Sequence, residues 1–317
     1  MSPLPPSPLV GFVLAVAAFG VLHDGGIPGE AALVPSRGAP VHLDEGPGVG
    51  EPGLGEFRIR QDTVVPVSPG DVFVSETLRG TLIVRAGGDE VRLSGDQDEL
   101  PILVREGSTV RLRPRRGARD ADVLLELPVW MPLSIRSRDL DVSVADHEAQ
   151  IRIETLSGDV RIDGVNGTVE ARTVNGEVEV RGTEGDMDLF TADGDVRVIG
   201  HRGRLRVEST DGDLTLRDVE GRTLGASTLD GDVEFDGAVE ENGSLDLSAH
   251  DGDVTVVLPA TVQAEVEVST FHGEFTSDFR VRTGGFRAGE PLRFQIGNGG
   301  TRIMLRSFDG DISIHSR

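Results

Sequence analysis

A glycine recurs every nine residues through the middle of this chain, and that period constrains the fold more than any other feature. The series is Gly158, Gly167, Gly176, Gly185, Gly194, Gly203, Gly212 and Gly221. Each unit reads as a turn followed by a short strand, as in Gly194-Asp-Val-Arg-Val. Such a unit is too small to bury anything alone, so the core must come from units stacked on one another.

Two kinds of unit alternate, which makes the true repeat eighteen residues long. A hydroxyl residue stands three positions before every second glycine, at Thr155, Thr173, Thr191, Ser209, Thr228, Thr270 and Ser307. Apolar residues follow the glycine by two and four positions, as Val196 and Val198 do, with the charged Arg197 between them. This alternation is typical of strands with one buried and one solvated face.

Two all-β folds fit the alternation. The favoured one is a β-solenoid, a two-sheet β-helix with coils of about 18 residues, each made of two nine-residue strand-turn units. The alternative is an antiparallel β-meander, because Asn-Gly and Asp-Gly pairs are strong hairpin signals. A meander would leave one long apolar face, and the sequence contains no amphipathic helix that could cover it. A coiled chain instead turns its apolar rows toward each other.

The first residues predict export. The apolar run from Leu9 to Leu22 is too short to span a bilayer comfortably, and Gly29-Glu-Ala31 offers a small-x-small cleavage site. Residues 1–31 are therefore predicted to be a signal peptide, and residues 32–56 a flexible Gly/Pro-rich spacer. The expected location is the periplasm, the outer envelope or the extracellular space.

The remainder, residues 57–317, is predicted to be one β-strand-repeat domain. Its expected parts are an irregular segment 57–150, a regular array 151–260 and closing coils 261–317. The irregular segment reads as the start of the same stack or a small cap upon it, since the open strand edges of a terminal coil need cover.

Three sequence features carry a resemblance to a known family. They are Leu127-Pro128 with Leu133-Ser-Ile-Arg-Ser137 before the array, the repeated Thr-x-Asn/Asp-Gly-Asp/Glu-Val-x-Val units, and the ending Ser307-Phe-Asp-Gly-Asp-Ile-Ser-Ile314. In these the chain resembles the bacterial toastrack family of β-strand repeats, a domain family of unknown function whose members carry the name "putative adhesin". The resemblance implies a two-sheet β-superhelix, export to the envelope, and adhesion or envelope-stress roles.

Charge and residue usage limit the chemistry. The formal charge of -23 and the pI near 4.6 argue against nucleic-acid binding, which needs a basic surface. The chain has no cysteine, so it has neither disulfides nor thiolate metal sites. The seven histidines share no spacing, no nucleophile-elbow motif is present, and the units leave no long loops to shape a cleft. We predict no enzyme activity, no catalytic residue and no cofactor.

The most specific candidate for a binding site is a series of aspartates that flank the turn glycines at equivalent positions. Calcium between coils would relieve their mutual repulsion, and the candidate ligands are Asp193, Asp195, Asp211, Asp213, Asp230 and Asp232. Known calcium-binding nonapeptides, however, need Gly-Gly-x-Gly-x-Asp, and these units supply one glycine of that set. The favoured interpretation is that the carboxylates accept backbone N–H groups in the turns.

Three further features have a structural and a functional interpretation. The hydroxyl column is expected to be a hydrogen-bonded ladder at a corner. The functional alternative is a row of hydroxyls that binds a sugar or ice. The arginines Arg111, Arg113, Arg115, Arg116 and Arg119 are expected to be a solvated charge run, with a patch for anionic lipids or acidic glycans as the alternative. The single tryptophan, Trp130, is expected to pack on a core or cap.

The sequence therefore predicts an exported, non-enzymatic binding or adhesion-like module of the cell envelope. One alternative is a glycan-active enzyme on a β-helix, and another is a partner of a membrane envelope-stress sensor. The expected partner is an envelope or surface component, either a protein or a glycan, whose identity these residues do not give. They do not give the oligomeric state either.

Overall fold

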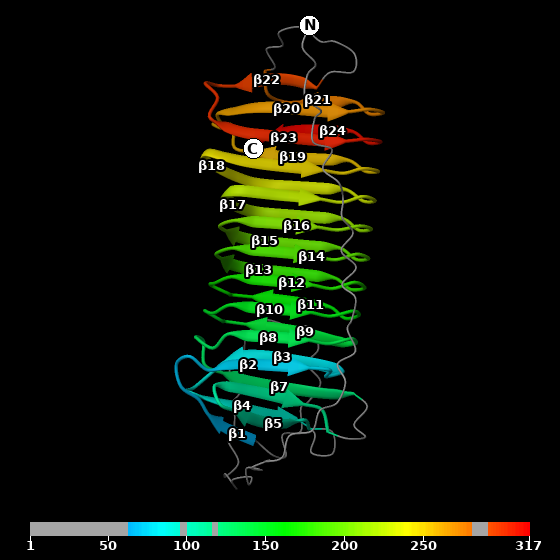
Figure 1. The fold of residues 1–317 in the computed structure, drawn as a ribbon. Coiled ribbons are helices and arrows are strands. Elements are labelled where there is room, and N and C mark those ends of the chain that lie inside the picture. The colour runs from blue at the N-terminus through cyan, green and yellow to red at the C-terminus, as the bar shows by residue number, and fades with distance from the viewer. Residues whose placement is uncertain (1–62, 96–99, 116–119, 281–290) are drawn as a thin grey trace, which may run out of the picture. The chain divides into compact units, whose positions relative to one another are not determined.

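The computed structural model describes residues 63–95, 100–115, 120–280 and 291–317, and this part of the chain is all-β (Figure 1). It contains strands β1 to β24, and none of the described residues forms a helix, let alone one able to cross a membrane. The predicted signal peptide and spacer, and residues 57–62 of the predicted domain, lie outside the described residues.

The strands form two long ladders that run the length of the array. The first ladder contains, in spatial order, β5 (Ile102–Glu106), β6 (Thr109–Arg113), β2 (Val72–Glu76), β8 (Leu133–Arg136), β10 (Ile151–Glu154), β12 (Val169–Arg172), β14 (Met187–Phe190), β16 (Leu205–Glu208), the second halves of β17 (Leu214–Ser227) and β18 (Val233–Ser248), β23 (Thr301–Ser307), β20 (Ala264–Thr270) and β22 (Leu292–Ile296).

The second ladder contains β1 (Thr63–Pro66), β4 (Glu90–Gly95), β7 (Ala121–Leu127), β3 (Gly80–Ala86), β9 (Leu140–Ala145), β11 (Val160–Asp163), β13 (Val178–Glu184), β15 (Val196–Arg202), the first halves of β17 and β18, β19 (Val254–Leu258), β24 (Ile312–Ser316) and β21 (Phe275–Ser277). Because β17 and β18 are long enough to take part in both ladders, hydrogen bonding runs through one continuous sheet.

Pairing within the array is parallel, with each strand bonded to the strand two positions along the chain. Val178 of β13 pairs with Val196 of β15, eighteen residues later, and Val196 pairs in turn with Leu214. A parallel register of this length requires the chain to wind once per eighteen residues. The fold is therefore β-solenoid-like, and the alternative antiparallel meander is wrong for the array.

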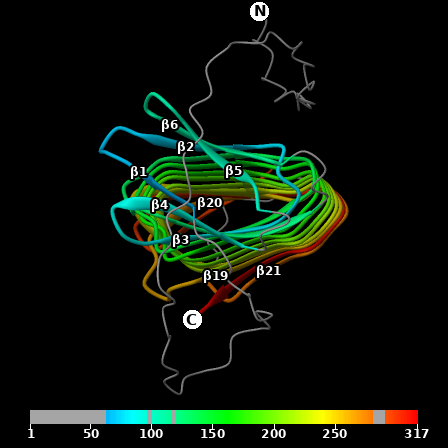
Figure 2. The same ribbon diagram turned by 90° about the horizontal axis from the view of Figure 1, so that it is seen from below.

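The strand pleat places the apolar row inside. Val196 and Val198 are fully buried and Arg197 between them is exposed, as the alternation predicts. The same facing recurs from strand to strand, and the buried apolar residues form one continuous core cluster. Figure 2, which looks along the stack, shows the coils superimposed as a flattened ring around this core. Its interior is filled mainly by valine, leucine and isoleucine side chains.

The order of the coils at both ends departs from the order of the sequence. β2 lies between β6 and β8, and β3 lies between β7 and β9, so the coil of β2 and β3 sits inside the later coil of β6 and β7. At the other end, β23 lies between β18 and β20, and β24 lies between β19 and β21. Strands from residues 261–317 thus lie at this end of the stack, but the last coil of the chain, β23 and β24, is inserted one position inward and does not lie outermost.

Antiparallel pairs close three of the four ladder ends. They are β5 with β6, β4 with both β7 and β1, and β20 with β22. The fourth end is the short strand β21, which has three residues. An exposed parallel edge is a template for pairing with another chain, and short or reversed terminal strands reduce that hazard.

Ion pairs cross the outer face of the first ladder from coil to coil. Glu154 accepts hydrogen bonds from Arg136 at 2.8 Å and from Arg152 at 2.9 Å, and Arg152 also reaches Glu170 at 3.2 Å. The hydrogen bond from Arg136 lowers the pKa of Glu154 and raises that of Arg136. On the second ladder, Arg161 Nε lies 3.9 Å from Glu179 Oε2, so oppositely charged residues are neighbours on this outer face as well.

Candidate functional site

One corner of the solenoid, here called the turn edge, is formed by the turns that carry the hydroxyl residues and every second glycine of the array. At Gly194 the backbone has φ +147°, and an added Cβ would overlap the carbonyl oxygen of Gly176 in the preceding coil. Glycine is required here because both the torsion angle and the close approach of the two backbones exclude a side chain. The nine-residue glycine period is thus a packing requirement of stacked turns.

The opposite corner has the same close approach, because an added Cβ at Gly185 or Gly203 would overlap a glycine carbonyl oxygen of the preceding coil, and it has a second glycine position three residues earlier. Gly164, Gly182 and Gly200 adopt left-handed torsion angles of φ 57° to 70°, and Asp146 and Asp218 take equivalent positions with φ 55° and 52°. An added Cβ at Gly182 would meet nothing within 4 Å. This second position therefore needs the left-handed conformation alone, and aspartate can replace glycine there.

The hydroxyl column joins successive coils at the turn edge. Thr191 Oγ1 donates to Gly176 O at 3.1 Å, and the same bond recurs for Thr173, Ser209, Thr228, Thr270 and Ser307 over 2.9–3.4 Å. Thr155 bonds within its own turn, to Ser157 O. The predicted ladder is confirmed, with a glycine carbonyl of the neighbouring coil as the acceptor. These hydroxyls are mostly buried, so they do not face a ligand.

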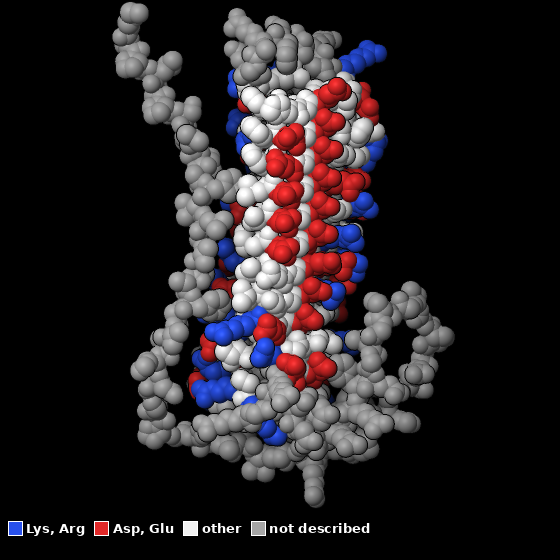
Figure 3. All heavy atoms as spheres, turned by 90° about the vertical axis from the view of Figure 1, so that its right-hand side faces the viewer, with Lys and Arg blue, Asp and Glu red and all other residues white. Residues whose placement is uncertain are grey.

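The aspartates form two columns on this edge, seen as two red lines in Figure 3. In the column after the glycine, Asp195 Oδ1 accepts from Asp213 N at 2.9 Å and Asp213 Oδ1 accepts from Asp232 N at 2.8 Å. The sequence interpretation had these acceptors serve their own turn, whereas in the structure they serve the turn of the next coil. Each carboxylate thus ties two coils together.

The column before the glycine is placed differently. Its members Asp193, Asp211, Asp230, Asp251 and Asp309 pair through single backbone bridges, and their side chains are exposed. Within the described residues no hydrogen bond is formed by the carboxylates of Asp193, Asp211 or Asp230. The described part of the chain also contains no group of three or more histidine, aspartate or glutamate side chains arranged to hold a metal ion.

A mostly apolar column, interrupted by Thr210 and His250, runs beside this column, one residue earlier in each turn. Of the large hydrophobic residues exposed in the described chain, four occupy this one position: Leu156, Val174, Phe308 and Phe271. At the end nearest β22, the rings of His250, Phe308 and Phe271 stack on one another. Their centroids are 4.8 Å and 5.1 Å apart, at interplanar angles of 18° and 6°. His272 meets Phe271 edge-on at 4.6 Å.

This aromatic stack, defined as His250, Phe308, Phe271 and His272, was not predicted from the sequence. The signal was present, because the first three residues share the register position just after the hydroxyl column. The last two coils are irregular in spacing, so that equivalence becomes clear only once the strand pairing is known. Phe271 is 70% exposed and lies at the end of the stack.

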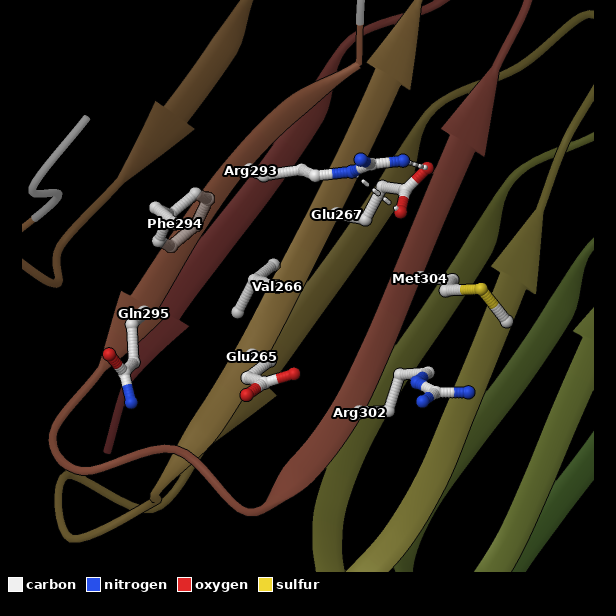
Figure 4. Close-up of a pocket in the computed structure, with 8 residues that line it drawn as sticks. All are labelled: Glu265, Val266, Glu267, Arg293, Phe294, Gln295, Arg302 and Met304. Carbon is white, nitrogen blue, oxygen red and sulfur yellow. Dashed lines mark hydrogen bonds and ion pairs between the residues drawn. The ribbon is translucent and has the colours of Figure 1, made fainter. Parts of the chain in front are cut away.

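A hollow of about 450 Å³ opens on the outer face of β20, β22 and β23 (Figure 4). Arg293 on β22 reaches Glu267 on β20 with two contacts, at 3.1 Å and 3.4 Å. Glu265, Gln295, Arg302 and Met304 complete its outward lining. The hollow thus offers planar, hydrogen-bonding side chains held on rigid strands.

Two buried histidines lie away from this surface. His147 Nε2 is 2.7 Å from Met131 O, and its Nδ1 has no hydrogen-bond partner. His201 Nδ1 is 2.9 Å from Thr183 Oγ1. Burial lowers the pKa of both imidazoles, which favours their neutral form. Both rings are fully buried, which fits a packing role.

The arginine run is largely neutralised where the structure describes it. Arg111 pairs with Glu76 at 2.8 Å and Arg113 pairs with Glu106 at 2.6 Å. Arg116 and Arg119 lie outside the described residues. Trp130 is partly buried and packs against the core, as expected. The paired arginines give no support to a patch for anionic headgroups.

The comparison with protein families agrees with this architecture. The model of the family described as "Toastrack DUF4097" matches residues 129–202 and 186–315, which together exceed half of the chain. The chain belongs to the toastrack family. The matched residues include both the regular array and the end where the aromatic stack and the hollow lie.

Solved structures similar to this toastrack chain share little sequence with it. A "putative adhesin" from Parabacteroides distasonis is 11% identical with a TM-score of 0.36, and the match covers 83% of this chain and 98% of that one. A "putative adhesin" from Bacteroides fragilis is 11% identical with a TM-score of 0.34, covering 80% and 95%. A "putative lipid binding protein" from Parabacteroides distasonis is 12% identical with a TM-score of 0.25, covering 81% and 93%. No curated protein matches the chain.

Proposed function

We propose that this toastrack chain is an exported two-sheet β-solenoid that serves, without enzymatic activity, as a binding or adhesion-like module of the cell envelope. The solenoid we infer has coils of about eighteen residues, each made of two nine-residue units. Export is supported by the apolar run from Leu9 to Leu22 and the small residues Gly29 and Ala31. The proposed domain spans residues 57–317.

The observation that carries the proposal is the exposed aromatic stack on the turn edge. Phe271 is 70% and Phe308 45% exposed. Exposed phenylalanines that stack on each other cost solvation free energy in the isolated protein, and such rings are enriched at recognition surfaces. The backbone of the stack is tied from coil to coil, because Phe308 N donates to His250 O at 3.2 Å and His272 N donates to Phe308 O at 3.0 Å. Binding there would therefore cost little conformational entropy.

We propose no enzymatic activity because the groups whose pKa is shifted lie away from the surfaces that a substrate could reach. Among the described residues, the clear pKa shifts occur at the buried His147 and His201 and at the ion-paired Arg136, Glu154 and Arg206. Burial and structural ion pairs account for all five shifts. None of these groups belongs to the hollow or to the aromatic stack, where a substrate would have access.

The test is co-sedimentation of the purified chain with envelopes isolated from source cells that lack its gene. We expect the chain to sediment with the envelopes and the double variant Phe271→Ala/Phe308→Ala to remain largely in the supernatant. The control is Leu156→Ala/Val174→Ala, which removes exposed apolar side chains at the same turn position far from the stack and should sediment normally. A chain that stays soluble in every case would refute the proposed function.

A further inference from the structure

The hollow and the aromatic stack belong to one continuous surface. Along β23 the pleat turns Met304 and Arg306 outward, and Phe308 follows in the same alternation. Along β20 the outward residues are Glu265, Glu267 and Ser269, followed by Phe271. From residue 304 to residue 308 the chain advances about 13 Å, at about 3.3 Å per residue. We call this surface, from the hollow to the stack, the β20–β23 stripe.

One end of the stripe is rich in planar polar groups. In Figure 4 the side chains of Arg293 and Glu267 meet across β22 and β20, while Glu265 and Arg302 lie on the neighbouring strands β20 and β23. Arg302 and Glu265 form no ion pair with any described residue, and both are exposed. A guanidinium donates and a carboxylate accepts several hydrogen bonds in one plane. These two groups are therefore free to bind neighbouring hydroxyls of a ligand.

The other end is an aromatic platform. Phe271 and Phe308 are nearly parallel, with an interplanar angle of 6°, and His272 stands edge-on to both at 77° and 83°. The ring of Phe271 is the more exposed of the two phenylalanines. Such a ring offers an apolar, electron-rich face to the C–H bonds of a ligand.

Between the two ends, charged residues neutralise each other. Arg306 lies 3.5 Å from Asp246, and Met304 supplies a partly exposed apolar contact. The stripe therefore has no continuous apolar patch of the kind that inserts into lipid. The backbone groups of β20 and β23 are paired with strands on both sides, so an extended peptide cannot add to the sheet at these two strands.

We propose that the β20–β23 stripe binds a short, uncharged hexopyranose oligosaccharide. The hydroxyls of a sugar fit the free guanidinium and carboxylate of the hollow, and the C–H face of a pyranose fits the Phe271 ring. An uncharged ligand also avoids repulsion from a chain with a formal charge of -23. This inference rests on the proposed binding function and names the class of ligand for it.

The experiment measures binding of cellotetraose, chitotetraose and maltotetraose to the full chain by calorimetry and by saturation-transfer NMR. We expect at least one tetrasaccharide to bind, with saturation transfer from the aromatic protons of the protein. Phe271→Ala and Arg302→Ala should each weaken its Kd by about tenfold or more. Val174→Ala, at the same turn position as Phe271, and Arg197→Ala, an exposed arginine without an ion pair in the described residues, should leave the Kd unchanged.

Three outcomes would overturn the inference. The first is no binding of any tetrasaccharide while the chain still sediments with envelopes, which would leave the proposed function standing with another ligand. The second is equal weakening by the Val174 and Arg197 controls, which would place the site elsewhere. The third is Phe271-dependent binding to phosphatidylglycerol vesicles without oligosaccharide binding, which would assign the stripe to lipid. Failure of both sedimentation and oligosaccharide binding would reject the proposed function as well.

Discussion

The carboxylate of Asp195 accepts a hydrogen bond at 2.9 Å from the backbone N–H of Asp213, eighteen residues later and one coil along the stack. Asp213 repeats the bond toward Asp232 at 2.8 Å, and Asp232 repeats it toward Asp253 at 2.8 Å. A like-charged row of residues therefore stabilises the stack, because each carboxylate satisfies a backbone donor that the turn would otherwise leave to solvent.

Removing one of these acceptors should cost stability. We expect Asp213→Ala to lower the free energy of unfolding by about 1 kcal/mol, because the Asp232 N–H loses its partner. Asp211→Ala, two residues away, removes an exposed carboxylate that makes no hydrogen bond within the described residues, and should change stability by less than about 0.5 kcal/mol. Urea unfolding of both variants tests this, and equal effects would contradict the role assigned to the column after the glycine.

Calcium should not be needed for folding. The Oδ1 atoms of Asp195, Asp213 and Asp232 already accept backbone N–H groups, and the turns lack the glycine set of the calcium-binding nonapeptide. Thermal unfolding in chelator and in millimolar calcium should nearly coincide. A large calcium-dependent rise in Tm that disappears when these three aspartates become asparagine would show a metal site instead.

Inward and outward positions should respond very differently to the same new charge. Val196→Asp would bury an unpaired carboxylate in the core, at a cost of several kcal/mol. Residue 197 is exposed and lies opposite Glu179 in the ladder. Arg197→Asp therefore places two like charges side by side in solvent and should cost about 1 kcal/mol or less. Chemical denaturation compares the two, and similar losses would refute the assigned facing of β15.

Two glycine positions of the coil, those of Gly194 and Gly182, should differ in their need for glycine. Gly194→Ala would drive a methyl group into the Gly176 carbonyl and should cost about 2 kcal/mol or more. Gly182→Ala faces open space and has to meet only the left-handed torsion angle, which costs about 1 kcal/mol. Thermal melts of the two variants measure the difference. If Gly182→Ala proved the more damaging, the close approach of stacked turns would not be the reason for the glycine period.

The free energy of unfolding should fall as the pH drops below the ordinary pKa of a histidine side chain. Burial lowers the pKa of His147 and His201 in the folded state, so the unfolded chain takes up their protons at higher pH than the folded one. Their contribution is therefore fully present above about pH 6.5, the unfolded value, and is lost as the pH falls below it. In the double variant His147→Gln/His201→Gln, the urea midpoint should depend less on pH between pH 5 and 7. An unchanged pH dependence would assign it to other groups.

Much of the fold follows from local pattern. The facing of Val196 and Arg197 and the glycine at each turn are encoded within a few residues of each other, because strand alternation and turn conformation are local properties. The absence of helix from the described residues follows in the same way, since the apolar period is two.

The candidate site could not be predicted in the same way. Phe308 and Phe271 are thirty-seven residues apart, and Phe308 stacks on His250 from fifty-eight residues earlier. The three rings meet because the last coil of the chain inserts between two earlier ones. A search of the sequence for aromatic clusters would not join these positions unless the coil order were already known.

By itself, the sequence determined that this chain is a stack of nine-residue strand-turn units with apolar rows inside and hydroxyl and aspartate columns at one corner. The tertiary structure decided which coils are neighbours, that Asp195 serves the turn of the next coil, and that Arg111 and Arg113 are paired with acids. The physical reason is that near-identical units can stack on one another in many orders with similar local energies. The order is therefore chosen by long-range packing at the two ends of the array, where the units cease to be alike.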